Sequence, residues 1–223
     1  MAGFNKKNKL TTKELAGQLR KPDGDLGKDV GLQMNKGNKY ICLNSYKVLN
    51  PKNEDCILEI GMGNGFFVKD LLAISSNLKY VGVDFSETMI QEANLINKTF
   101  INTGVVKFQQ ASIEELPFED NTFDCITTTN TLYFWPQPEE NIKELLRVLK
   151  PEGKLLVAYR LKELMDKIEL SQYGFEKYDI DNVENLFEKS GFKTITTEII
   201  CEPELEFDGK LFQMKGAYSI GYK

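Results

Sequence analysis

The chain has 223 residues, of which 41% are hydrophobic and 27% are charged, and its formal net charge at pH 7 is −5. These values are ordinary for one globular domain, and a chain of this length can bury a sizeable core without disulfides or structural metals. The sequence contains no histidine, which excludes the commonest general base and the commonest metal ligand.

The first 50 residues read as two or three short helices. They place apolar pairs at helical spacing: Leu15 with Leu19, Val30 with Met34, and Ile41 with Val48. This segment carries ten Lys/Arg and four Asp/Glu, a net charge of +6, so the remainder carries −11. A basic arm on an acidic body can indicate nucleic-acid binding, but no arginine cluster accompanies it. We favour solvated helices that cover the C-terminal edge of a sheet, and we predict no nucleic-acid partner.

From residue 50 onward, strand-like and helix-like segments alternate. Apolar, strand-like runs lie at 56–60, 79–85, 104–110, 123–132 and 154–160. Between them we predict a helix at 66–74, a helix with Ser86 as its N-cap, and a helix that starts at Pro138 and stops at "KPEGK". Strands that alternate with helices form βαβ units, so we expect an α/β domain with a mainly parallel sheet and helices on both faces.

After the fifth strand the alternation stops. Residues 161–178 are irregular and are predicted to form a lid insertion. A helix near 181–190 and two β-rich segments, 192–201 and 211–222, complete the chain. Because no repeat interrupts the pattern, we predict a single domain over residues 1–223, in which 1–50 form an N-terminal helical cover.

The cysteines and the N-terminal sequence indicate the cellular compartment of the protein. The N-terminal sequence has lysines but no apolar h-region, so we predict no signal peptide. No segment approaches the roughly 20 apolar residues of a membrane span. The four cysteines are Cys42, Cys56, Cys125 and Cys201, and no two of them form a CxxC pair. Cys56 and Cys125 lie in apolar, strand-like runs. We therefore expect reduced thiols in a cytoplasmic protein without a membrane partner.

The stretch "ILEIGMGNGFF" at 57–67 places three glycines, Gly61, Gly63 and Gly65, directly after the first strand. Glycine there lets the backbone approach a ligand and adopt positive φ. A dinucleotide site has the spacing G-x-G-x-x-G, whereas here the third glycine comes one residue early. Glu59 would also place a carboxylate near a pyrophosphate, which is unfavourable. Asp84 ends the second strand and can accept both hydroxyls of a ribose. The pattern favours an adenosine ligand without pyrophosphate.

Four motifs in register resemble the class I S-adenosylmethionine-dependent methyltransferases, particularly the small-molecule branch typified by ubiquinone/menaquinone-biosynthesis methyltransferases. The motifs are "LEIGMGNG", "VGVDFSETMI", "ASIEELPFEDNTFDCITTTNTLYFW" and "ELLRVLKPEGKLLVAYR", between about Asp55 and Arg160. The resemblance implies a doubly wound, Rossmann-like fold whose mainly parallel, seven-stranded sheet has an antiparallel C-terminal strand. It also implies S-adenosyl-L-methionine as cofactor, S-adenosyl-L-homocysteine as product, and in-line methyl transfer to a small-molecule acceptor.

The resemblance also assigns parts of the cofactor to residues of this chain. Glu59 and the glycine turn, which consists of Gly61, Gly63, Asn64 and Gly65, would hold the loop around the methionine moiety, and Asn130 would face the methionine part. Asp84 would bind the ribose. Phe85 and Met89 would flank the adenine ring, and Ser112 and Ile113 would lie beside its edge. Relatives often have aspartate where this chain has Ser112. A hydroxyl can still accept from the adenine amino group, so we expect somewhat weaker binding and not loss of the site.

The acceptor side is predicted from position. Tyr133 and Trp135, after the fourth strand, would wall the acceptor pocket, and Arg160 could pair with an acidic acceptor. Tyr133 is the candidate for removing a proton if the acceptor is a hydroxyl. No metal-binding motif is evident. "NTLYFW" differs from the N-P-P-Y of amino-methylating nucleic-acid enzymes because both prolines are absent. A non-catalytic module that binds S-adenosylmethionine and has a regulatory role is the alternative function.

Overall fold

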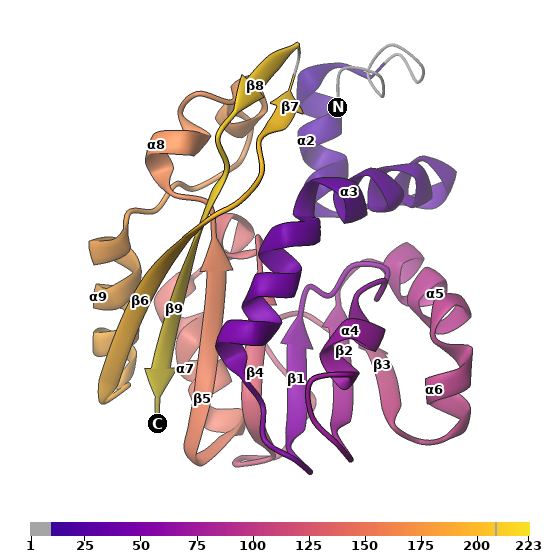
Figure 1. The fold of residues 1–223 in the computed structure, drawn as a ribbon, viewed down its shortest axis with the longest axis vertical. Coiled ribbons are helices and arrows are strands. Elements are labelled where there is room, and N and C mark those ends of the chain that lie inside the picture. The colour runs from indigo at the N-terminus through magenta and orange to yellow at the C-terminus, as the bar shows by residue number, and fades with distance from the viewer. Residues whose placement is uncertain (1–9, 208) are drawn as a thin grey trace.

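The computed structural model describes residues 10–207 and 209–223, and a seven-stranded sheet forms its centre (Figure 1). The strand order is β3-β2-β1-β4-β5-β9-β6. The first five strands of the chain run parallel, and β9 is antiparallel to both of its neighbours. The predicted doubly wound sheet with an antiparallel C-terminal strand is thus confirmed. The strands are β1 Cys56–Ile60, β2 Lys79–Asp84, β3 Val106–Gln110, β4 Phe123–Thr129, β5 Leu149–Tyr159, β6 Thr194–Cys201 and β9 Lys215–Tyr222.

The helices begin and end where local sequence signals place them. Ser86 caps α5, since its hydroxyl accepts from the backbone N–H of Met89, and Pro138 occupies the first turn of α7. Gly191 ends α9 in the left-handed conformation. The helices are α2 Thr12–Arg20, α3 Gly24–Leu49, α4 Val68–Leu72, α5 Glu87–Ile96, α6 Lys98–Asn102, α7 Pro138–Val148, α8 Lys162–Met165 and α9 Ile180–Ser190, with the short 3₁₀ segments η1 Leu132–Phe134 and η2 Glu169–Gln172.

Two apolar cores lie on opposite faces of the sheet. One core packs α3 and α4 against the strands through Ile41, Leu49 and Leu71. The other packs α7 and α9 against them through Leu145 and Phe187. Strands covered on both faces must be apolar almost throughout, which explains the continuous hydrophobic runs in the sequence. No helix within residues 10–207 and 209–223 is long and apolar enough to cross a membrane.

The N-terminal segment differs from the prediction of two or three short helices. After α2, residues Gly24–Leu49 form one helix of 26 residues. Its internal glycines allow close packing instead of ending the helix. A Cβ at Gly27 would lie 2.6 Å from the backbone of Pro22, and one at Gly31 would lie 3.1 Å from Cε of Met89. Figure 1 shows α3 passing above the strand ends and then crossing one face of the sheet.

Two features of the second half were not predicted. Strand β5 starts at Leu149 and not at residue 154, because a register shift lets the "KPEGK" turn remain within the strand. A small hairpin of β7 Leu205–Phe207 and β8 Lys210–Phe212 connects β6 to β9. It rises beyond the carboxyl end of β5 (Figure 1). The predicted β-rich tails are otherwise confirmed as β6 and β9.

A buried ion pair ties together the ends of three strands. Arg160 directly follows β5 and Glu202 directly follows β6. The guanidinium Nη1 and Nη2 donate to the carboxylate oxygens of Glu202 at 2.7 and 2.8 Å, and both side chains are at most 5% exposed. Tyr218 on β9, which lies between the other two strands, donates to the same carboxylate at 3.3 Å. The base of the hairpin is thereby attached to the sheet.

We expect Glu202→Gln to lower the free energy of unfolding by about 3 kcal/mol or more, because it leaves the buried guanidinium without its counter-charge. Urea denaturation measures this loss. Exchanging both partners, Arg160→Met with Glu202→Leu, should recover most of it. The matched control is Glu163→Gln, which breaks the exposed pair with Lys167 and should leave the free energy of unfolding nearly unchanged, because solvent screens an exposed pair. Equal effects at the two sites would contradict this account.

Candidate functional site

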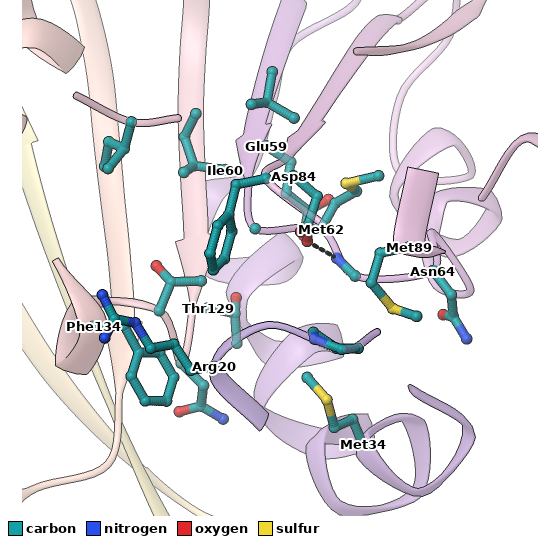
Figure 2. A pocket seen from close by; sticks show the side chains of 18 of the residues that line it. Arg20, Met34, Glu59, Ile60, Met62, Asn64, Asp84, Met89, Thr129 and Phe134 are labelled. Atoms are coloured by element: carbon teal, nitrogen blue, oxygen red, sulfur yellow. Dashed lines mark hydrogen bonds between the residues drawn. The ribbon is translucent and has the colours of Figure 1, made fainter. Parts of the chain in front are cut away.

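A cavity of about 400 Å³ lies at the carboxyl ends of β1, β2 and β4, below the N-terminal helices. In a doubly wound sheet this edge gathers the loops that follow the parallel strands. Figure 2 shows Glu59 and Asp84 on one side of the cavity and Met34 of α3 across from them. The predicted site residues that line it are Glu59, Gly61, Gly63, Asn64, Asp84, Phe85, Met89, Ser112, Ile113, Asn130 and Trp135.

Asp84 is fixed at the end of β2 by the loops on either side of it. Its Oδ2 accepts from the backbone N–H of Gly63 at 3.0 Å, and its Oδ1 accepts from that of Ser86 at 2.9 Å. Burial raises the pKa of the carboxyl to about 6, although both hydrogen bonds act in the opposite direction. A carboxylate offers about four acceptor positions, so Asp84 can still accept two ligand hydroxyls.

Glu59 lies deeper in the cavity wall, on β1, and two tyrosines hold it. Tyr46 of α3 donates to both carboxylate oxygens at 3.0 Å, and Tyr80 of β2 donates to one of them at 2.8 Å. Burial raises the pKa of Glu59 to about 7, and the tyrosine hydrogen bonds oppose that rise. The costly burial of this carboxylate is thus offset by two buried donors.

The three glycines of the loop have different tasks. All three have positive φ, between 60° and 66°. A Cβ at Gly61 would come within 2.4 Å of the Thr131 side chain, whereas one at Gly63 would meet no protein atom within 4 Å. Gly61 and Gly63 line the cavity, whereas Gly65 is not among its lining residues. A Cβ there would lie 2.8 Å from Asn97, so this glycine allows α5 to pack closely.

The remaining predicted adenine-side residues lie together, and the turn between α2 and α3 reaches them. The hydroxyl of Ser86 donates to the carbonyl of Pro22 in that turn. Lys21 places its Nζ 5.4 Å from the ring centre of Phe85. Ser112 donates to Glu114 at 3.0 Å. A carboxylate that the sequence prediction did not include therefore lines this edge.

A second, smaller cavity of about 110 Å³ adjoins the first. Five residues line both cavities, namely Leu19, Met34, Asn38, Asn130 and Phe134. Of the three residues predicted for the acceptor, Tyr133 and Arg160 line the second cavity, while Trp135 lines the first and donates to Thr131 at 3.1 Å. The wall of the second cavity is otherwise mainly apolar.

Tyr133 is poorly suited to act as a base. Its hydroxyl oxygen accepts from the backbone N–H of Arg160, and its proton is donated to Oδ1 of Asn130 at 3.0 Å. Burial raises the pKa of Tyr133 well above its ordinary value. The structure therefore corrects the prediction that this hydroxyl takes a proton from the acceptor.

Arg160 is not free to bind an acidic acceptor. Both terminal nitrogens of its guanidinium are engaged by Glu202, and the residue is 4% exposed. Its charge is already neutralised inside the fold, so binding an anion would require breaking a buried pair. The predicted role in acceptor binding is therefore corrected to one of structure.

The largest omission of the sequence prediction is helix α3. Its side chains Met34, Asn35, Asn38, Cys42 and Tyr46 line the first cavity. Their spacing is helical, and a cover over the strand ends was expected. Nothing in the sequence, however, indicated which face of a helix outside the recognised motifs would meet the cavity.

Comparison with known proteins identifies the family. Residues 58–157 match the family model described as "Methyltransferase domain". The ubiquinone/menaquinone biosynthesis C-methyltransferase UbiE of Klebsiella pneumoniae strain 342 is 28% identical over 173 residues, which cover 74% of this chain and 67% of the relative. The UbiE protein of Escherichia coli K12 is 27% identical with the same coverage.

Solved structures agree on the fold. A methyltransferase dependent on S-adenosylmethionine from Aquifex aeolicus superposes with a TM-score of 0.64 at 23% identity, covering 89% of this chain and 99% of the other. A chain of the complex between the Haloferax volcanii Trm112 methyltransferase activator and a methyltransferase reaches a TM-score of 0.73 at 16% identity, covering 86% and 92%. The methyltransferase-domain match and the UbiE relatives together support a class I S-adenosylmethionine-dependent methyltransferase that resembles UbiE.

The residues around the first cavity fit this cofactor. Its volume is in the range of small-ligand sites. Glu59 and Asp84 supply acceptors that suit an ammonium group and hydroxyls. Nδ2 of Asn35 is a buried donor without a hydrogen-bond partner among residues 10–207 and 209–223, and a ligand acceptor would satisfy it.

Gly63→Ala should abolish binding of S-adenosylhomocysteine while the protein stays folded. The new methyl group meets open space on the cavity side, where the ligand must approach. Positive φ costs alanine about 1–2 kcal/mol. Gly104→Ala is the matched control, because Gly104 has φ of 74° and also open space but does not line the cavity. Calorimetry that finds the same affinity in both variants would refute the placement of Gly63.

Binding of S-adenosylhomocysteine should weaken as pH falls through the pKa of Asp84, about 6. The protonated carboxyl loses acceptor positions, so the apparent Kd should rise about tenfold between pH 7 and pH 5 if only the ionised form binds.

The stability of the free protein should depend on pH in the opposite sense, so that acid pH favours the folded state at this carboxyl. Because the folded pKa lies above the ordinary 3.8, the contribution of Asp84 to stability declines as pH rises from about 4 to 6.

Calorimetry across this pH range tests the assignment, with Asp84→Asn and Glu59→Gln as paired variants. The Asn variant should lose the part of the weakening centred near pH 6, and the Gln variant should keep that part. The reverse pattern would assign the titration to Glu59.

Proposed function

We propose that this methyltransferase transfers the methyl group of S-adenosylmethionine to a small, largely apolar acceptor bound in the second cavity. The observation that carries this proposal is the common wall of the two cavities, where a ligand in one lies next to a ligand in the other. The UbiE relatives are named for the biosynthesis of ubiquinone and menaquinone, which supports a small-molecule acceptor.

The proposed placement of the cofactor follows the lining of the first cavity. Asp84 accepts from the ribose hydroxyls, and Phe85 and Met89 contact the adenine. Glu59 and the glycine turn surround the methionine end. Asn130, at the end of β4, lines both cavities and so stands between the cofactor and the acceptor.

An apolar acceptor is favoured by the chemistry of the second cavity. Its wall includes the apolar side chains of Met165, Ile168, Leu170, Phe175 and Met214. Within the described part of the chain, Arg160 is the one cationic residue of this lining, and Glu202 neutralises its charge. An anionic acceptor would find no unpaired positive charge among the described residues of this wall, which favours an apolar acceptor over an acidic one.

The proposed mechanism is alignment. The bound cofactor supplies a methyl group on a positively charged sulfur, which is already a strong electrophile. The chain fixes the reacting atoms in line and excludes water, an effect of proximity and orientation. Because the hydroxyl of Tyr133 is held between Arg160 and Asn130, the acceptor would bring its own activated nucleophile, such as a nitrogen, a thiolate or a stabilised carbanion.

The cover and the lid are part of the proposal. We propose that residues 1–223 work as one domain in which the 1–50 segment covers the site and 161–178 closes it. The contacts of Leu19 and Met34 with both cavities support the cover. Ile168, Leu170 and Phe175 support the lid, because they line the second cavity. Cytoplasmic location and the absence of a nucleic-acid partner stay predictions.

Transfer of a labelled methyl group from S-adenosylmethionine to a component of a small-metabolite extract tests turnover and identifies the acceptor. With that acceptor in hand, Phe175→Leu should raise its KM about tenfold, because an aromatic wall is lost, while the Kd of S-adenosylhomocysteine stays unchanged. Tyr173→Leu, an exposed neighbour, is the control and should change neither value. Absence of any labelled product would favour a non-catalytic binding module. An equal loss of cofactor binding in Phe175→Leu would show that the second cavity is not the acceptor site.

A further inference from the structure

Two asparagines of α3 line the first cavity, and Figure 2 shows Met34 of the same helix across the cavity from Asp84. Asn35 and Asn38 are three residues apart, so they are neighbours on the helix surface, and both line the cavity. Neither belongs to the motifs that indicated the site in the sequence. Their amide groups are therefore available to a ligand from a helix that the sequence placed only as a cover.

The amide nitrogen of Asn35 is buried and has no hydrogen-bond partner in the described part of the chain. A buried donor without an acceptor costs about 1–3 kcal/mol. Such an orphan is rare in folded proteins and indicates an acceptor that the protein itself does not supply. Because Asn35 lines the cavity, a bound ligand can supply that acceptor.

The orientation of Asn38 is set by a chain of hydrogen bonds with a fixed direction. The backbone N–H of Arg160 can only donate, so the hydroxyl of Tyr133 accepts from it and donates to Oδ1 of Asn130. The Asn130 amide nitrogen then donates to Oδ1 of Asn38 at 3.1 Å. This leaves Nδ2 as the free end of Asn38, with no partner among residues 10–207 and 209–223.

The two asparagines thus present donors on one side of a cavity whose other side holds acceptors. Glu59 and Asp84 on the sheet side attract a positive group and repel a negative one. The methionine end of S-adenosylmethionine carries one ammonium and one carboxylate, so the two sides of the cavity match opposite ends of this group. Among residues 10–207 and 209–223, Arg20 is the one cationic side chain in the cavity lining, and it is exposed at the end of α2.

We propose that Asn35 and Asn38 bind the carboxylate of the methionine moiety of S-adenosylmethionine. The proposal rests on the cofactor placement given above, with the ribose on Asp84. It makes α3 a part of the cofactor site, because the ligand then bridges the helix and the strand ends. Cofactor binding would satisfy the orphaned donor of Asn35 and fasten the cover to the sheet.

Calorimetry with two ligands tests the proposal without recourse to turnover. S-adenosylhomocysteine carries the carboxylate, and its decarboxylated analogue keeps the adenosine, the sulfur and the amine. Asn35→Leu should weaken S-adenosylhomocysteine about tenfold or more, the effect of losing a hydrogen bond to a charged group, and should leave the analogue unchanged. Lys36→Met, at an exposed neighbouring position of α3, is the control and should alter neither ligand.

The isosteric variants Asn35→Asp and Asn38→Asp sharpen the test. Asp at position 38 keeps an oxygen that accepts from Asn130, but it replaces the free N–H with a second acceptor. Each variant should weaken S-adenosylhomocysteine more than Asn35→Leu does and should not weaken the analogue. The thermal midpoint of the free protein should not fall in Asn35→Leu, since no protein partner of the amide is lost.

Three results would overturn the proposal. Equal weakening of both ligands would show that the asparagines only shape the cavity. Loss of the preference for the carboxylate in Arg20→Gln, with Asn35→Leu unchanged, would assign the carboxylate to the arginine. If the unaltered protein binds S-adenosylhomocysteine and Asn35→Leu binds it equally well, only this inference fails; if the unaltered protein binds neither ligand, the proposed function fails with it.

Discussion

The site depends on the hydrogen bonds that hold the buried carboxylate of Asp84. A carboxylate at the end of an apolar parallel strand needs donors, and the backbone amides of Gly63 and Ser86 supply them. Gly63 can do so because its positive φ turns the loop toward the strand. The same two bonds set the position of the glycine loop and the start of α5. One satisfied charge thus organises the loops on both sides of it.

The second half of the site is organised from α3. Tyr46 satisfies Glu59 from this helix, and Asn38 joins it to the end of β4 through Asn130. Gly31 permits the close approach to Met89 that brings the helix over the cavity. The helix therefore contributes buried polar partners as well as apolar cover, and its placement decides what the cavity can bind.

Three of the polar side chains in and beside the second cavity are engaged within the fold. Arg160 and Glu202 neutralise each other, and Tyr133 links the backbone after β5 to Asn130. Side chains that look reactive in the sequence thus serve to connect strands. The side chains that face the second cavity are mainly apolar. A wall of this kind suits a mechanism that aligns the reactants better than one that needs a base from the protein.

The sequence by itself determined the fold class, the order of the parallel strands along the chain, and which residues of the local motifs gather around the first cavity. Glu59, the glycines and Asp84 could be predicted because each lies within a few residues of a strand end, where chain-local geometry sets its position. The close approach of Gly65 to Asn97 could not be predicted, since it depends on the packing of α5. The partners of Arg160 and Tyr133, and the cavity-facing side of α3, were decided only by the tertiary structure. These contacts join residues that are distant in the chain, as Arg160 and Glu202 are, and no local periodicity encodes which buried charges will meet.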